Sequence, residues 1–231
     1  MNMRINPLVS GIGVALVLAA IFLLWQKPSF LNFSNSPANS GVASTTIDVD
    51  NGVSVPTSGE AVAVLPIENP NAVHPALDRA VSIPPSIPAD AAAILTQKLA
   101  EDNASLKANP DQLIVWLQYG VYLKIAQDYQ GARGAWEYVA AAAPSNYVAF
   151  FNLGELNMGI LKDYPKAEAD FKKVIELRPD LPDGYRDLYT LYHYAYKVGS
   201  GADAAILEQG LKANPGNKDL LELQAQLQAR K

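Results

Sequence analysis

The chain of 231 residues contains no cysteine and two histidines. Without cysteine it cannot form disulfide bonds or thiolate metal sites, and its N-terminus cannot carry a lipid-modified cysteine. A histidine-based metal site needs further ligands at a suitable spacing, and neither His74 nor His193 has such neighbours in the sequence. We interpret His193 as a packing or groove residue. The sequence therefore predicts no metal and no cofactor.

Clusters of basic residues and phosphate-binding loops are also missing. The net charge is −5, whereas a nucleic-acid-binding protein gathers Lys and Arg on one face. Gly11 and Gly13 lie in an apolar run, and Gly131 and Gly134 lie at a predicted turn. Neither pair follows a strand or precedes the Lys-Ser/Thr of a nucleotide loop. With no catalytic residue set in view, we predict a protein that is not an enzyme and binds neither nucleic acid nor a small-molecule substrate.

A long uncharged run stands near the N-terminus. Leu8 to Trp25 comprises 18 residues without charge, which as a helix span about 27 Å. This length approaches the roughly 30 Å hydrocarbon core of a bilayer. The alternative is a cleavable signal peptide, whose apolar region is shorter and is followed at once by a small-x-small site. The run ends instead in Gln26-Lys27-Pro28, so we predict a retained transmembrane anchor over residues 1–27, with membrane contact at 5–25.

The orientation of this anchor follows from its flanking charges. Arg4 and the terminal amine precede the apolar run, and Lys27 follows it. Positive charge at the N-terminal side favours a cytoplasmic N-terminus. The expected location is a single-pass membrane protein with its main domain on the extracytoplasmic side.

Residues 28–88 read as a linker. They include nine prolines and many Ser, Asn, Gly and Thr residues, a composition that cannot bury enough apolar surface to offset the entropy of ordering. We predict that this linker is mostly disordered. One exception is Thr46 to Val55, which alternates around Asn51-Gly52, a strong hairpin turn. An isolated hairpin is marginal in water, so both readings stay open.

The end of the linker is more apolar. Val73 to Ile87 places Leu77, Val81 and Ile83 directly before the first predicted helix of the main domain. We expect this segment to pack against the folded part of the chain as an extended strap.

The remainder of the chain is periodic. Proline recurs at Pro110, Pro144, Pro179 and Pro215, and the sequence Leu-Lys-Ala-Asn-Pro occurs at both 106–110 and 211–215. A period near 34 residues indicates stacked helical hairpins. A single hairpin of this size cannot bury its own apolar face, so the units must share a continuous core.

Each unit repeats the same anchor positions. The first helices carry large apolar residues and a glycine, and the second helices carry small and large apolar residues before the proline. The anchors of the first unit are Trp116, Tyr119, Gly120, Ala132, Trp136 and Ala140. Those of the second are Phe150, Leu153, Gly154, Ala167, Phe171 and Val174. The third unit keeps Tyr185, Leu188, Tyr192, Ala204, Leu207 and Leu211 but has Tyr189 where glycine is expected.

These anchors resemble the tetratricopeptide repeat (TPR). The resemblance implies an all-α fold, a right-handed α-solenoid of helical hairpins, preceded here by the transmembrane helix and the linker. We expect a capping helix at 89–108, repeats at 109–144, 145–179 and 180–215, and a C-terminal capping helix at 217–231.

Several local expectations accompany this fold. Asn109 and Gln112 should form a capping box around Pro110, and Gln130-Gly131 should form the first hairpin turn. Tyr189 should push the third hairpin apart, with the longer turn at Val198–Ala202 accommodating it. The tyrosines of that unit share one helical face, which we interpret as core packing rather than as an aromatic ligand platform: Tyr185, Tyr189, Tyr192 and Tyr196.

In TPR proteins the first helix of each hairpin lines a concave groove. The resemblance therefore implies partner-binding residues on these helices: Leu117, Gln118, Val121, Lys124, Phe151, Asn152, Glu155, Met158, Arg186, Asp187, Thr190 and His193. Some family members grip a terminal carboxylate with Lys, Asn and Arg. Leu117 and Val121 stand at such positions, so we predict no carboxylate clamp but an apolar wall. Either a partner segment or the chain's own strap, Leu77 to Ile87, would cover that wall.

The predicted function is that of a membrane-anchored TPR scaffold or adaptor, which binds a protein or peptide partner through the groove. The alternative is a structural subunit of an envelope assembly such as secretion, pilus or cytochrome-maturation machinery. A catalytic subunit is the least favoured reading, because the resemblance carries a fold and no chemistry.

Overall fold

The computed structural model describes residues 46–49, 53–56 and 65–229. Strands β1 (Thr46–Val49) and β2 (Val53–Pro56) pair antiparallel, in agreement with the hairpin reading of this segment. The predicted anchor at 1–27 lies outside the described residues. Within them, no helix combines the length and apolarity that a bilayer span requires.

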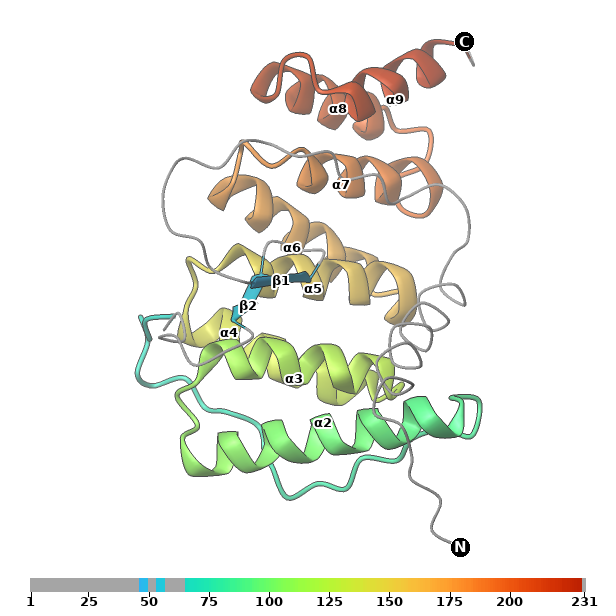
Figure 1. Cartoon of the computed structure of the whole chain (residues 1–231). Coiled ribbons are helices and arrows are strands. Elements are labelled where there is room, and N and C mark those ends of the chain that lie inside the picture. Colours follow the sequence, from blue (N-terminus) through green and yellow to red (C-terminus); the bar gives the residue numbers. More distant parts are fainter. Residues whose placement is uncertain (1–45, 50–52, 57–64, 230–231) are drawn as a thin grey trace, which may run out of the picture.

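The main domain is a stack of helical hairpins (Figure 1). In its described part the helices are α2 (Ala89–Ala108), α3 (Leu113–Ile125), α4 (Tyr129–Ala142), α5 (Tyr147–Leu156), the π-helical turn η2 (Asn157–Leu161), α6 (Tyr164–Leu177), α7 (Pro182–Tyr194), α8 (Ala202–Ala213) and α9 (Lys218–Gln228). α3–α4, α5–α6 and α7–α8 form three hairpins, with α2 and α9 at the two ends. The helices follow the order expected from the proline spacing, and the fold is a TPR-like helical repeat.

In the first two hairpins, the close approach of the helices requires glycine. A Cβ at Gly154 would lie 2.6 Å from the Phe171 ring, and one at Gly120 would clash with the Trp136 ring. In the third hairpin the large side chain stands on the first helix and the smaller one on the second helix. Tyr189 replaces the glycine, and Leu207 takes the place of Trp136 and Phe171 on the second helix; both side chains are buried. Because Leu207 is smaller than Trp136 and Phe171, it leaves room for Tyr189, and α7 and α8 need not separate further to hold the tyrosine side chain.

A left-handed residue follows the first helix of every hairpin. Gln127, Lys162 and Lys197 have φ of 61°, 57° and 62°. In the second hairpin the turn η2 precedes Lys162, and this π-helical turn takes up the one extra residue of that repeat. The first two hairpins therefore keep the same turn geometry, with a capping aspartate directly after the left-handed residue. The longer third turn adds Gly199 and Gly201, with φ of 74° and 83°.

Two predicted boundaries are wrong. Helix α3 begins at Leu113 without a side-chain cap, because Gln112 turns back and its Nε2 donates to the carbonyl of Ser105 at 3.0 Å. The predicted capping box is thus absent, and Gln112 ties α3 to the end of α2. Helix α4 begins at Tyr129, so the first turn precedes Gln130-Gly131; Asp128 caps the helix by accepting from the Gly131 N–H.

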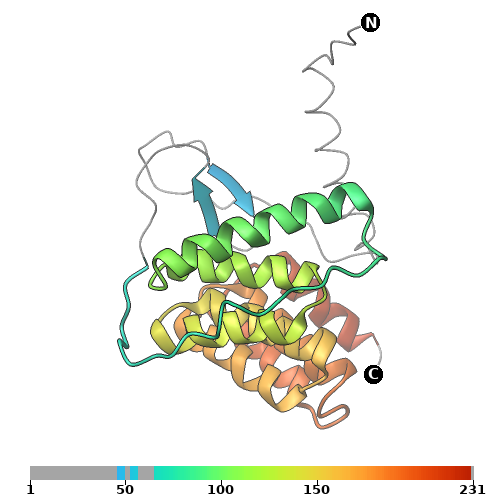
Figure 2. The same ribbon diagram turned by 90° about the horizontal axis from the view of Figure 1, so that it is seen from below.

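Residues 65–88, here named the strap, lie along the first part of the stack (Figure 2). Their half-buried apolar side chains pack against the core of α2, α3 and α4: Leu65, Ile67, Ala72, Leu77, Val81, Ile83 and Ile87. The expected strap is present and starts earlier than Val73. The expectation of disorder is therefore wrong for residues 65–72, because Leu65, Ile67 and Ala72 also find apolar surface to pack on.

The strap contacts the second helices of the stack. The backbone N–H groups of Glu68 and Asn69 donate to the carbonyl of Ala142 at the end of α4. Asn103 Nδ2 on α2 donates to the Leu77 carbonyl at 2.7 Å. The expectation that the strap could cover the groove of the first helices is wrong, because α2 and α4 hold it on the opposite side.

Candidate functional site: the face of the first helices

We call the sides of α3, α5 and α7 that point away from α4, α6 and α8 the first-helix face. Gly120 marks the inner side of α3, where it packs on Trp136. Residues 118, 121 and 125 lie on the opposite side of the same helix, at helical spacing. This face corresponds to the groove expected from the sequence.

Four of the predicted groove residues are buried within the chain itself: Leu117, Phe151, Asn152 and Asp187. Phe151 meets the edge of Phe171, with ring centroids 6.3 Å apart. These side chains contribute to packing in the stack and are not presented to solvent. The predicted apolar wall at Leu117 is thus absent, and only Val121 of that pair remains exposed.

The other predicted residues remain partly or fully exposed: Gln118, Val121, Lys124, Glu155, Met158, Arg186, Thr190 and His193. Val121 is 41% exposed, and Ile125, one turn further along α3, is 37% exposed. The sequence analysis did not identify Ile125 as part of this face. Its i, i+4 spacing from Val121, in a helix with few polar residues, could have indicated it.

Polar side chains surround this exposed apolar pair. Gln118 Nε2 donates to Tyr122 Oη at 3.3 Å and lies 3.4 Å from Asp102 Oδ1 on α2. Burial raises the pKa of Asp102 to about 7, and its Oδ2 has no hydrogen-bond partner among the described residues. Lys124 Nζ lies 3.5 Å from Glu155 Oε2, which joins α3 to α5. Asp102 was not predicted as part of this face, since it belongs to the capping helix.

Arg186 is held by two carboxylates of its own helix. It pairs with Asp183 and with Asp187, whose Oδ1 is 3.0 Å from its Nε. Burial raises the pKa of Asp187 to about 7, although the Arg186 charge opposes this shift. The guanidinium is thus already paired within its own helix, and the absence of a carboxylate clamp stays a prediction.

Three of the four tyrosines predicted to form core packing are buried, namely Tyr185, Tyr189 and Tyr192, and Tyr196 packs half-buried against the same core. Their interpretation as core residues is confirmed. His193 stacks on Tyr189 with an interplanar angle of 13°, and its Nδ1 lies 2.7 Å from Asp203 Oδ2. Among the described residues, no group of three or more His, Asp or Glu side chains is arranged to hold a metal ion.

No family model and no curated protein matches this chain. Among solved structures, it is similar to the "MamA RS-1 ArsTM double mutant", with 19% identity and a TM-score of 0.45 over 53% of this chain and 67% of the other. It is similar to "MamA MSR-1 C2" with 23% identity and a TM-score of 0.43 over 58% of this chain and 71% of the other. It is similar to a chain of the "CopN-Scc3 complex" with 15% identity and a TM-score of 0.45 over 70% of this chain and 83% of the other. The description of the fold as TPR-like rests on the hairpins of this chain and their anchor residues.

Proposed function

We propose that this protein is a membrane-anchored scaffold that binds a protein partner through the first-helix face. The observation that carries the proposal is the exposed pair Val121 and Ile125 on α3. A helix within a stack normally turns polar residues to solvent, and exposed apolar groups that lie together mark contact surfaces.

The polar groups around this pair indicate what the partner presents. Arg186 is bound by Asp183 and Asp187, and Lys124 lies against Glu155. The face therefore offers apolar surface and hydrogen-bonding groups without an excess of positive charge. A segment with Leu or Phe side chains fits this surface better than an acidic terminus does.

The membrane attachment is supported by the sequence. The uncharged run Leu8–Trp25 would anchor the chain, and its flanking charges would place the helical domain on the extracytoplasmic side. Carbonate extraction and N-terminal sequencing of the mature protein test this part. A soluble product that starts near residue 40 would contradict it.

The binding surface is tested by capture of partners with the full chain in detergent. Val121→Asp places a charge on the exposed apolar pair, and Val198→Asp, at a residue 63% exposed in the turn before α8, is the matched control. We expect Val121→Asp to abolish capture and Val198→Asp to leave it intact, with unchanged helicity in both. Equal capture by the two variants would overturn the assignment of this face.

A further inference from the structure

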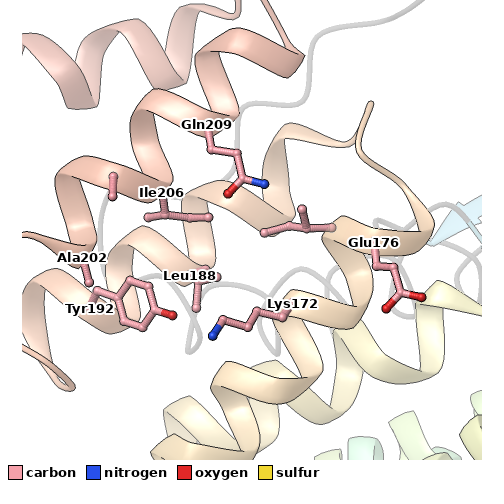
Figure 3. A pocket seen from close by; sticks show the side chains of 9 residues that line it. Lys172, Glu176, Leu188, Tyr192, Ala202, Ile206 and Gln209 are labelled. Carbon is pink, nitrogen blue, oxygen red and sulfur yellow. The ribbon is translucent and has the colours of Figure 1, made fainter.

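A groove between α6 and α8 matches the groove that holds the strap. It holds an open pocket of about 490 Å³ with Leu188 and Tyr192 of α7 at its base (Figure 3). Lys172 and Glu176 project from the α6 side, and Ala202, Ile206 and Gln209 line the α8 side. The surface belongs to the second helices and is thus separate from the first-helix face.

The two grooves correspond residue by residue. Helices α2, α3 and α4 align with α6, α7 and α8 when the C-terminal caps of the second helices and the prolines that follow them are matched. The groove positions then pair as follows: Asn103 with Lys172, Tyr119 with Leu188, Gly131 with Ala202, Gly134 with Ala205, and Tyr138 with Gln209.

The strap uses these same positions on α2 and α4. Its His74 ring lies 5.9 Å from the Tyr138 ring, and Pro75 lies over Gly134. The Leu77 carbonyl accepts from Asn103 Nδ2. Arg79 then reaches the N-terminus of α4. The strap thus runs in an extended form, opposite in direction to α4.

The α6–α8 groove keeps the apolar part of this binding mode. Ala205 is small like Gly134, and Ile175, Ile206 and Leu188 supply an apolar floor. The groove can therefore accept an extended chain with apolar side chains, as the strap site does. The aromatic ring of Tyr138 and the carboxylate of Asp128 have no counterpart, because Gln209 stands at the position of Tyr138 and the N-cap of α8 is Gly201.

A hydrogen-bond donor is also present at the position of Asn103. Lys172, with its side chain 58% exposed, can donate to a backbone carbonyl as Asn103 does. Lys172 pairs with Glu168, but Lys197 also binds Glu168, so that carboxylate keeps a partner when Lys172 is engaged elsewhere.

The middle groove, between α4 and α6, has different charges at these positions. Glu137 of α4 stands where Lys172 stands in the α6–α8 groove, and an ionised carboxylate cannot donate to a backbone carbonyl. Lys166 and Lys173 of α6 stand where α8 has Ala202 and Gln209.

These differences make the middle groove an internal control. Lys166 and Lys173 pair with Asp163 and Glu176, so an apolar segment seated there would desolvate two lysines at positions where the α6–α8 groove has the uncharged Ala202 and Gln209. Ala169 of α6 occupies the position of Ala205. The two grooves can therefore be probed at equivalent alanines.

We propose that the α6–α8 groove binds an extended segment of a partner protein that contains proline and leucine, seated as residues 74–79 are seated on α4. Proline would lie over Ala205, and a backbone carbonyl would accept from Lys172. The strap of a second copy is a poorer occupant, since it would have to give up the Arg79–Asp128 ion pair and the Asn103–Leu77 hydrogen bond. This proposal does not depend on binding at the first-helix face.

The absence of cysteine makes a site-specific test possible. Ala205→Cys in the full chain in detergent receives an environment-sensitive fluorophore, and Ala169→Cys is the matched control in the middle groove. The probe is a synthetic peptide of residues 72–81, Ala-Val-His-Pro-Ala-Leu-Asp-Arg-Ala-Val. We expect a saturable change of the fluorophore at position 205 and none at position 169. A peptide with Asp in place of its proline and leucine should bind at least about tenfold more weakly.

A double variant transfers the charges of the middle groove to this site. Ala202→Lys copies Lys166, and Lys172→Glu copies Glu137. Together they should abolish binding of a labelled peptide without loss of helicity, whereas Val121→Asp on the first-helix face should leave this binding unchanged. Undiminished binding by the folded double variant would contradict the proposed seating of the segment.

Two further outcomes decide the proposal. Because a fluorophore at position 205 stands where the proline would lie, the deciding negative is measured on the chain without the fluorophore. Failure of the labelled peptide to bind that natively folded chain at up to millimolar concentration would overturn the proposal. A response at position 205 that appears without peptide, rises with chain concentration and is lost when Pro75→Asp is added would assign the groove to a second copy instead.

Discussion

Arg79 of the strap forms an ion pair with Asp128, the residue that caps helix α4. One carboxylate oxygen of Asp128 pairs with Arg79, and the other accepts from the Gly131 N–H at 3.1 Å. The strap is therefore joined to the helical stack through a residue that also starts a helix.

Substitutions of this pair should have unequal effects. Arg79→Ala removes only a partly exposed ion pair and should lower the free energy of unfolding by at most about 1 kcal/mol. Asp128→Ala also removes the helix cap and should lower it by about 1–2 kcal/mol. Chemical unfolding of the full chain in detergent measures both. Equal losses would mean that the cap contributes nothing beyond the ion pair.

The apolar side chains of the strap should stabilise the stack. Leu77→Ala removes a half-buried side chain that packs on the first core and should lower the free energy of unfolding by about 1–2 kcal/mol. Val73→Ala is the control, because Val73 is 87% exposed, and it should stay within about 0.5 kcal/mol. Similar unfolding midpoints for the two variants would show that the strap contributes no stability.

Gly154, on the inner side of the second hairpin, should tolerate no side chain. Gly154→Ala places a Cβ 2.6 Å from the Phe171 ring and should destabilise the chain by about 1–3 kcal/mol. A Cβ at Gly159 meets no atom within 4 Å, so Gly159→Ala should be neutral or slightly stabilising. Thermal unfolding of both variants tests the contrast, and a neutral Gly154→Ala would refute the close approach of α5 and α6.

The buried Asp102 should make stability depend on pH. Its pKa is raised from 3.8 to about 7 by burial, so the folded chain binds a proton more tightly than the unfolded chain does. This group therefore favours folding at low pH, and its contribution is lost as pH rises from about 4 to about 7. Asp102→Asn keeps the shape without the charge. Urea unfolding should show little difference between the variant and the natural chain at pH 4.5 and a gain for the variant at pH 8. A difference that is the same at both pH values would contradict the raised pKa.

Much of the fold follows from the sequence because the relevant interactions are local. Residues such as Gly154 and Phe171 belong to one hairpin, and their spacing requires two helices that approach closely. The prolines and the repeated Leu-Lys-Ala-Asn-Pro define the period, and hairpins of this size must stack. The cap helices α2 and α9 were predicted for the same reason, since both ends of a stack must be closed.

The candidate site was predicted less completely. The helical spacing identified Gln118 and Val121 but assigned Leu117 to the same surface, although it is buried. Spacing within α3 determines which side meets α4. How closely α3 approaches the helices of the neighbouring repeats depends on contacts between repeats, and these contacts cannot be predicted from the residue spacing within one helix. The same holds for Phe151, Asn152 and Asp187.

By itself the sequence determined the number of hairpins, their order and the inner side of each, because period and residue size act within one repeat. Only the tertiary structure decided where the strap lies. Its apolar residues indicated that it would pack, but the choice of α2 and α4 depends on Asn103, Asp128 and the Ala142 carbonyl, which the fold brings together from different helices. The open groove between α6 and α8 became apparent in the same way, since its likeness to the strap site is a likeness of surfaces formed by three helices.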